Sequence, residues 1–107
     1  MMPRNTPLDP ELARALAERL KQLRWESGLT QEEVAHNAGL SRVMLQNYER
    51  GFSDRERKTP ANPSLGTLVD LAWALDVDVK TLLADLPLKH TSAALPNPKR
   101  KTTSGAR

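Results

Sequence analysis

The chain has 107 residues, of which 27% are charged, 38% are hydrophobic and none is cysteine. This length suits one small domain with flexible ends and excludes two independent cores around a catalytic cleft. The absence of cysteine excludes disulfides and thiolate chemistry, and the two histidines, His36 and His90, lie too far apart in the sequence to suggest a metal pair. We therefore expect neither an enzyme nor a metal or cofactor site. An aromatic content of 4% favours helices, so an all-α fold is predicted.

The formal net charge of +3 is distributed unevenly. Residues 87–107 hold five basic residues and no acidic one, a local charge of +5, so that residues 1–86 total −2. The basic pI of about 9.6 therefore originates in the C-terminal segment and does not characterise the domain. Residues 1–7 lack the apolar stretch of a signal peptide, and no later segment has the roughly 18 apolar residues of a membrane span. We expect a cytoplasmic protein.

The first predicted helix begins after Asp9, the expected N-cap residue. Pro10 suits its first position, where the missing N–H has no helical partner, and Gly28 ends the helix after Glu26. Apolar side chains recur along this segment at helical spacing and predict one buried face. The stripe consists of Leu12, Leu16, Leu20 and Leu23.

Two shorter helices are predicted next, joined by a tight turn. Thr30 and Glu33 have the spacing of a capping box at the start of one helix, which Gly39 ends. Ser41 caps the following helix, and Gly51 supplies the left-handed residue that stops it. The side chains expected to face inward are Val34, Ala35, Ala38, Leu45 and Tyr48. Two short helices around a glycine turn have the layout of a helix-turn-helix.

The spacing inside this motif has a physical reason at each position. When Gln31 is counted as the first residue, the fifth is Ala35, which is small where the two helices cross. Gly39, the ninth, can adopt a positive φ in the turn. Leu45 and Tyr48, the fifteenth and eighteenth, anchor the second helix of the motif. A helix-turn-helix can contact DNA through the outward face of its second helix. The alternative is an ordinary helical hairpin with no DNA role, but this alternative does not explain why the outward face of the second helix is polar.

Two further helices are expected after a loop. Residues 52–63 contain two prolines and no apolar periodicity, which predicts an exposed loop. Ser64 caps a fourth helix, and Asp78 caps a short fifth helix that carries Leu82 and Leu83. The apolar stripe of the fourth helix is predicted to be Leu65, Leu68, Leu71, Ala72 and Leu75.

The chain is therefore expected to divide into three parts. Residues 1–7 form a flexible N-terminus, residues 8–86 a compact five-helix domain, and residues 87–107 a disordered basic tail. The tail is predicted to be disordered because it consists largely of Thr, Ser, Asn, Pro and Lys and has little apolar surface to bury.

Residues 8–86 resemble the Cro/repressor-type (cI-like) helix-turn-helix family of bacterial and phage transcriptional regulators. The resemblance is carried by the runs Gly28-Leu29-Thr30-Gln31-Glu32-Glu33-Val34-Ala35, Ala38-Gly39-Leu40-Ser41, Tyr48-Glu49-Arg50-Gly51 and Leu71-Ala72-Trp73-Ala74-Leu75-Asp76-Val77. It implies a lambda-repressor-like domain and a repressor that binds a palindromic operator in double-stranded DNA as a homodimer. Asp76 departs from the family pattern, which usually has glycine there, but aspartate tolerates a left-handed conformation.

By position, the resemblance places the third helix in the major groove with Arg42, Val43, Gln46 and Asn47 at the base edges. Arginine can bind guanine through two hydrogen bonds, asparagine or glutamine can pair with adenine, and valine can pack on a thymine methyl group. Phosphate contacts are expected from the helix N-termini, the end of the third helix and the following loop. These residues are Thr30, Gln31, Ser41, Arg50, Arg55, Arg57 and Lys58.

Several alternatives stay open from the sequence. Arg55 and Arg57 each lie beside an acidic residue, so either contacts to phosphate or plain solvation fits these two charges. The tail run at residues 99–101 fits contact with DNA as well as a solubilising role. Trp25 and Trp73 lie off the leucine stripes and either pack at the rim of the core or form a dimer or partner surface. The domain as a whole could serve mainly to bind a protein partner, as an antitoxin or an adaptor does.

Overall fold

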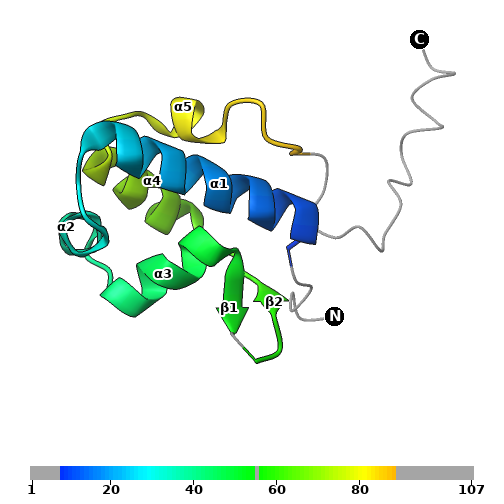
Figure 1. Cartoon of the computed structure of the whole chain (residues 1–107). Helices are drawn as coiled ribbons and strands as arrows, with labels where there is room; N and C mark the ends of the chain where they lie inside the picture. Colours follow the sequence, from blue (N-terminus) through cyan, green and yellow to red (C-terminus); the bar gives the residue numbers. More distant parts are fainter. Residues whose placement is uncertain (1–7, 55, 89–107) are drawn as a thin grey trace, which may run out of the picture.

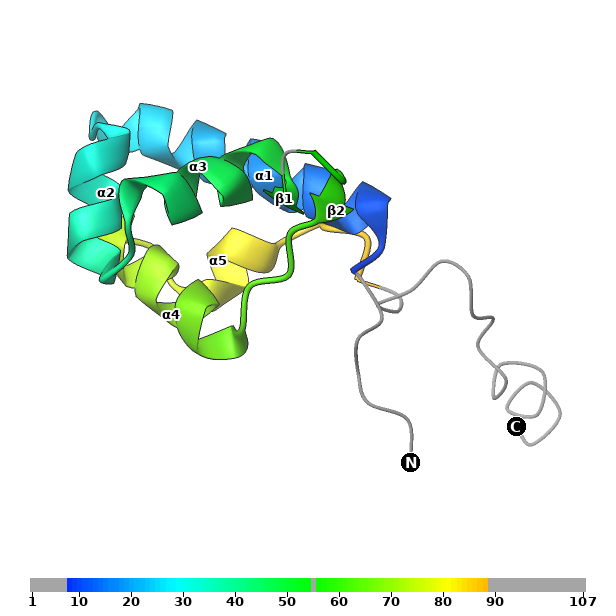
Figure 2. The same cartoon turned by 90° about the horizontal axis from the view of Figure 1, so that it is seen from below.

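The computed structural model describes residues 8–54 and 56–88. Its elements are α1 (Pro10–Ser27), α2 (Gln31–Ala38), α3 (Arg42–Arg50), β1 (Phe52–Asp54), β2 (Thr59–Pro60), α4 (Leu65–Ala74) and α5 (Val79–Leu83). Helix α1 runs the length of the bundle, and α2 closes the end opposite the hairpin (Figure 1). Figure 2 shows α1 and α3 in one layer and α4 and α5 in the other. The mainly helical, five-helix fold predicted from the sequence is confirmed.

Side-chain caps begin α2 and α3 as predicted. The backbone N–H of Glu33 donates to the Thr30 hydroxyl oxygen at 3.1 Å, and the Glu33 carboxylate accepts from the Thr30 N–H at 2.9 Å, which completes the capping box. Ser41 accepts a cap hydrogen bond from the third residue after it at 3.1 Å. Gly39 ends α2 and Gly51 ends α3, both with positive φ. The bounds of both helices are therefore set by local sequence.

The ends of the other helices agree with the sequence in most respects. Ser64 and Asp78 cap α4 and α5. The backbone N–H of Thr81 donates to the Asp78 carboxylate at 2.7 Å, and this bond holds the pKa of that carboxyl below its usual range. Asp9 occupies the N-cap position of α1, but its side chain makes no cap hydrogen bond. Asp76 has a φ of 61°, so aspartate does adopt the left-handed conformation after α4.

One hydrophobic core joins all five helices. Its largest fully buried side chains are Leu20, Val34, Leu45, Leu71 and Leu82. Ala35 and Ala38 are buried in the same core, and Tyr48 packs against it. The inward-facing residues predicted for the helix-turn-helix are therefore confirmed. The core holds α2 and α3 in a fixed relation, which leaves the remaining faces of both helices at the surface.

The segment after α3 differs from the loop predicted over residues 52–63. Strands β1 and β2 form an antiparallel hairpin, and Lys58 in its turn has a φ of 56°. The strands have three and two residues, too few for the alternating apolar pattern by which a strand is recognised in a sequence. The hairpin contacts α1. At its base, a Cβ on Gly51 would lie 3.4 Å from the Ala13 carbonyl oxygen, so the chain approaches α1 closely there.

The prediction that Leu65 belongs to the buried stripe of α4 is wrong, because its side chain is 68% exposed. The side chains of Leu71 and Leu75 are buried on the side of the helix that faces the core. Leu65, in the first turn, lies on a different side of the helix from these two residues. Leu65, Val69 and Trp73 are spaced by four residues and are all exposed. We call these three residues the α4 face. It is an apolar surface without a partner among the described residues.

Arg19 holds the C-terminal helix on α1. Its guanidinium donates to the carbonyl oxygens of Thr81 at 2.8 Å and Leu82 at 3.4 Å, within α5, and of Ala84 at 2.7 Å, just after it. A helix of five residues leaves most of its carbonyls without helical partners, and a guanidinium carries several donors in a fixed geometry. This contact joins residues more than 60 positions apart, so no local sequence pattern predicts it.

Candidate nucleic-acid interface

Helix α3 has its N-terminal half at the surface. Arg42 and Val43 are exposed, and Gln46 and Asn47 are half-buried. Leu45, 1% exposed, fixes the other side of the helix in the core. The helical repeat places Val43 and Asn47 opposite Leu45, with Arg42 and Gln46 on the adjoining side of the helix. Their arrangement is therefore compatible with a single surface that a ligand can contact.

A buried ion pair joins α1 to α3 close to this surface. Glu49 is 4% exposed, and it is the one charged side chain that is buried within residues 8–54 and 56–88. The Arg24 guanidinium donates to both of its carboxylate oxygens, from Nε at 2.7 Å and from Nη2 at 3.1 Å. Two parallel hydrogen bonds fix the relative direction of the two groups as well as their distance.

The same carboxylate orients Gln31 at the start of α2. The Gln31 amide nitrogen donates to Glu49 Oε1 at 3.0 Å. Because an ionised carboxylate only accepts hydrogen bonds, the Gln31 amide turns its nitrogen toward Glu49 and its oxygen away. That oxygen accepts from the amide nitrogen of Gln46 at 3.4 Å. One predicted phosphate-contact residue and one predicted base-reading residue are thus connected to the buried ion pair.

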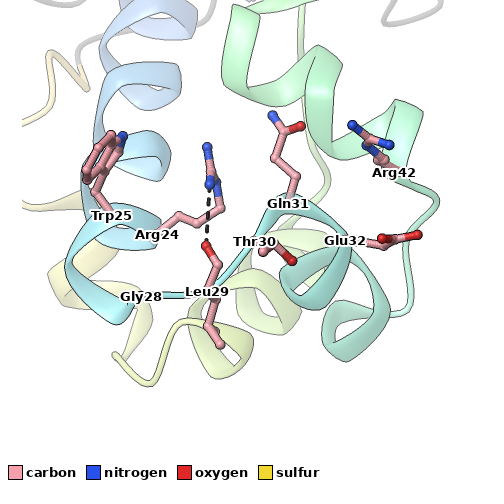
Figure 3. Close-up of a pocket in the computed structure, with 8 residues that line it drawn as sticks. All are labelled: Arg24, Trp25, Gly28, Leu29, Thr30, Gln31, Glu32 and Arg42. Carbon is pink, nitrogen blue, oxygen red and sulfur yellow. Dashed lines mark hydrogen bonds between the residues drawn. The ribbon is translucent and has the colours of Figure 1, made fainter.

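A cleft opens between the end of α1 and the starts of α2 and α3. Its volume is about 700 Å³, and we call it the Trp25 cleft. Figure 3 shows the side chains of Arg24, Gln31 and Arg42 extending to the same side of the ribbon. The lining residues are Arg24, Trp25, Gly28, Leu29, Thr30, Gln31, Glu32 and Arg42. The cleft therefore brings together three of the predicted contact residues, from two helices.

A second hollow, the α1–α3 groove, lies between these two helices. Its lining includes the basic residues Arg14, Lys21, Arg24 and Arg50, and the acidic residues Glu18 and Glu49. Lys21 is paired with Glu18 at 3.1 Å, and Arg24 is paired with Glu49. Arg14 and Arg50 therefore provide the excess positive charge of the groove. Such charge beside α3 is suited to contacts with phosphate groups.

The other predicted phosphate contacts are placed in two different ways. Thr30 and Ser41 cap their helices through the hydroxyl oxygen, so each hydroxyl hydrogen can still be donated to a ligand. Arg57 and Lys58 are exposed in the turn of the hairpin and line neither hollow, and Arg57 lies 3.8 Å from a carboxylate of its own hairpin. Arg55 lies outside the described residues, as does the tail from residue 89 onward.

Neither tryptophan packs at the rim of the core. Trp25 is 79% exposed and Trp73 is 73% exposed, so of the two readings that the sequence left open, rim packing is wrong for both. Trp73 belongs to the α4 face, and Trp25 lines the cleft named after it. Both indoles are therefore available to partners from outside the described part of the chain.

Four residues of the α1–α3 groove were not predicted from the sequence. They are Arg14, Lys21, Arg24 and Glu49. A signal for Glu49 was present, because it follows Leu45 by four residues and so falls on the buried side of the helix. A carboxylate in that position requires a partner. Nothing local identified Arg24 as the partner, since 25 residues separate the two in the chain.

Residues 8–54 and 56–88 contain neither a metal-binding cluster nor a membrane-spanning helix. No group of three or more His, Asp or Glu side chains is placed there to hold a metal ion. No helix in these ranges combines the length and the apolar character needed to cross a membrane.

Comparison with known protein families places the whole motif in a defined group. A family model described as a helix-turn-helix domain matches residues 15–86, which include all of α2, α3, α4 and α5. The chain belongs to this helix-turn-helix family. The resemblance to Cro/repressor-type regulators noted from the sequence is thereby confirmed.

Curated relatives of this helix-turn-helix chain are regulators of transcription. SinR of Bacillus subtilis, an HTH-type transcriptional regulator, is 35% identical over 68 residues, which are 64% of this chain and 55% of SinR. The immunity repressor protein of Bacillus phage phi105 is 36% identical over 86 residues, which are 80% of this chain and 54% of the repressor. The chain thus spans about half the length of these relatives.

Solved structures of the family support the same assignment. The restriction-modification controller protein C.AhdI from Aeromonas hydrophila is 34% identical with a TM-score of 0.56, over 65% of this chain and 94% of that protein. The biofilm master regulator SinR, solved in complex with DNA, is 35% identical with a TM-score of 0.52, over 64% of this chain and 97% of that one. The helix-turn-helix domain is therefore of the type found in DNA-bound regulators.

Proposed function

We propose that the chain is a sequence-specific DNA-binding regulator of transcription, that it acts as a repressor in the cytoplasm, and that residues 8–86 are its DNA-binding unit. The observation that carries the proposal is the outer side of α3, where Arg42 and Val43 are exposed and Gln46 and Asn47 are half-buried, while Leu45 is held in the core. An operator occupied by this domain is closed to RNA polymerase. Repression of this kind requires no chemical step.

In the proposed complex, α3 lies in the major groove of double-stranded DNA. Arg42 binds the O6 and N7 atoms of a guanine, and Val43 packs against a thymine methyl group. Gln46 and Asn47 supply amides that can pair with adenine. The hydrogen bond from Gln46 to Gln31 uses only one of the two amide hydrogens of Gln46, so its oxygen and its other hydrogen stay available to a base.

Phosphate contacts position α3 in this complex. The N-termini of α2 and α3, with Thr30, Gln31 and Ser41, provide hydrogen-bond donors and the positive ends of two helix dipoles. Arg50 provides charge at the other end of α3. Arg57 and Lys58 are proposed to reach the DNA backbone from the hairpin, and Arg55 is proposed as a further phosphate contact.

We expect Arg42→Ala to relax the preference for one base pair while changing the others little. The loss of a guanine contact made by two hydrogen bonds corresponds to about 1–3 kcal/mol of discrimination at that position. The measurement is selection from random duplexes, followed by titration of single-base variants of the selected site at a fixed salt concentration.

Arg50→Gln is the matched control, because it also removes an exposed arginine from α3, but from the opposite end. It should weaken binding to all sequences alike and reduce the salt dependence by about one unit of slope. If both variants lower affinity uniformly, α3 does not read bases through Arg42, and the assignment of the reading surface is wrong.

We propose that the chain binds a palindromic operator as a homodimer, and the proposal is supported by the general point that one short helix contacts too few bases for useful specificity. The α4 face is the proposed contact between two copies. It consists of Leu65, Val69 and Trp73, and exposed apolar surfaces that carry an aromatic residue are favoured in dimer contacts.

We expect Trp73→Gln to raise the dimer dissociation constant by about tenfold or more, because buried tryptophans are common hot spots in interfaces. Sedimentation equilibrium without DNA measures this constant directly. Trp25→Gln is the control, since Trp25 is equally exposed but lies outside the α4 face. Equal effects of the two substitutions, or none, would show that the copies associate elsewhere.

Binding of a protein partner is a second candidate function. The observation in its favour is a solved complex of the SinR protein with the SinI protein. The matched protein in that complex is 32% identical to this chain with a TM-score of 0.53, over 85% of this chain and 77% of that one. A partner recovered in stoichiometric amount with the intact chain, together with no selected DNA site, would favour an antitoxin or adaptor over a DNA reader.

A further inference from the structure

Trp25 is the most exposed of the large hydrophobic side chains in the described ranges. A tryptophan carries roughly 150–250 Å² of surface, most of it apolar, so its exposure in a small domain indicates a contact surface. We propose that Trp25 contacts the sugar–phosphate backbone of DNA, beyond the phosphate bound at the start of α2. This inference rests on the proposed DNA-binding function and adds a contact that the helix-turn-helix motif does not include.

The location of Trp25 is the first argument. It lines the same cleft as Thr30, Gln31 and Arg42, which are all predicted to contact DNA. Figure 3 shows these positions in order across the cleft, with Arg42 at the start of α3, Gln31 at the start of α2 and Trp25 in the last turn of α1. A strand whose base meets Arg42 and whose phosphate meets Gln31 continues toward the indole.

The chemistry of the cleft is the second argument. Arg24, beside the indole, is engaged by Glu49 and by the carbonyl oxygen of Leu29 at 3.4 Å, so its guanidinium has few donors left. Two of the five N–H groups of Arg24 remain, and the indole N–H of Trp25 adds a further donor at this end of the cleft. The acidic residue of the lining, Glu32, lies on the side of the cleft near Arg42 in Figure 3, away from Trp25. A phosphate beside the indole therefore avoids that carboxylate.

The surroundings of Trp25 favour nucleic acid over a second copy of the chain. Interface cores between proteins are depleted of charged residues. The α4 face consists of three apolar side chains with one exposed acidic neighbour, Asp70, whereas the lining around Trp25 is polar or charged apart from Leu29 and Gly28. A sugar–phosphate unit presents an apolar ribose face and hydrogen-bond acceptors, which match the flat apolar surface and the single N–H of an indole.

The two tryptophans allow a direct test, because each can serve as the only fluorescent indole in the chain. Trp73→Phe leaves Trp25 as the reporter, and Trp25→Phe leaves Trp73. Each variant is titrated with the selected duplex at a protein concentration where self-association is complete, and acrylamide quenching is measured with and without DNA. Quenching of Trp25 should fall several-fold in the complex, whereas that of Trp73 should not change. Unchanged quenching of Trp25 in a saturated complex would overturn the inference.

Affinity provides the second measurement. Trp25→Ala should weaken binding to all sequences by about tenfold and leave the base preferences unchanged. Duplexes shortened stepwise from each end should reach a length at which the wild type and Trp25→Ala bind equally, because the contacted backbone is gone. Thermal unfolding of the free variant confirms that the exposed substitution leaves the fold intact.

The outcomes separate this inference from the function on which it rests. If the wild type binds a selected duplex and Trp25→Ala binds it equally well, the Trp25 contact is overturned and the DNA-reading function stands. If the wild type binds no duplex above its affinity for random DNA, both the proposed function and the Trp25 contact fall. A loss confined to one base pair would assign Trp25 to base reading and would also overturn the backbone contact.

Discussion

Replacing Glu49 by alanine is expected to lower the free energy of unfolding by about 3 kcal/mol, at the lower end of the range for breaking a buried ion pair. The substitution removes the acceptor of three hydrogen bonds, two from Arg24 and one from Gln31. The Arg24 side chain is 19% exposed, so water can partly replace the lost partner, which is why the lower end applies. Urea unfolding followed by circular dichroism measures the loss.

Glu18→Ala is the matched control for this ion pair. Glu18 also pairs with a basic residue of α1, but both partners are largely exposed, at 68% and 42%. Exposed pairs of this kind contribute less than about 1 kcal/mol. A loss below 1 kcal/mol for Glu49→Ala would show that the network has no structural role and that the orientation of Gln31 is set by other contacts.

Leu45→Ala is expected to lower the free energy of unfolding by about 2–5 kcal/mol, the range for truncating a fully buried leucine. Leu45 fixes α3 in the core, so a cavity at this position also loosens the helix that carries the proposed base-reading residues. Affinity for the selected DNA should therefore fall together with stability. Urea unfolding and DNA titration of the same preparation measure the two effects.

Val43→Ala distinguishes an effect on folding stability from an effect on base recognition. Val43 lies two residues before Leu45 and is 63% exposed, so its truncation should change the free energy of unfolding by less than about 0.5 kcal/mol. It should still alter the preference at the base pair whose thymine methyl it contacts. Comparable destabilisation by the two truncations would mean that α3 is rotated relative to the arrangement described above.

The parts of the fold that the sequence predicted are those determined by neighbouring residues. The capping box of Thr30 and Glu33, the Ser41 cap and the left-handed Gly39 each depend on fewer than about five consecutive residues, so their effect is the same in many proteins. The spacing of Ala35 and Leu45 then defines the packing of the motif. The predicted site residues on α3 follow from these positions, and their contacts with DNA remain predictions.

The features that the sequence did not predict depend on contacts between distant segments. The hairpin has too few residues to show a strand pattern, and Arg24 reaches Glu49 from another helix. Leu65 has the same apolar character and spacing as the buried leucines of α4, so periodicity alone could not show that it is exposed. Composition identifies a side chain as apolar, but only the packing of the neighbouring helices determines whether it is covered.

The contact of Arg19 with α5 has a consequence for how the domain opens. Helices of five residues are not stable in isolation, and terminal elements are usually the first to open in a folded protein. The guanidinium of Arg19, in the middle of α1, donates to the carbonyl oxygens of Thr81, Leu82 and Ala84, and the side chain of Leu82 lies fully buried in the shared core. These contacts link α5 to α1, so we expect the amide of Leu82, which donates to the Asp78 carbonyl, to exchange with solvent nearly as slowly as the amides of the core helices in a hydrogen-exchange measurement.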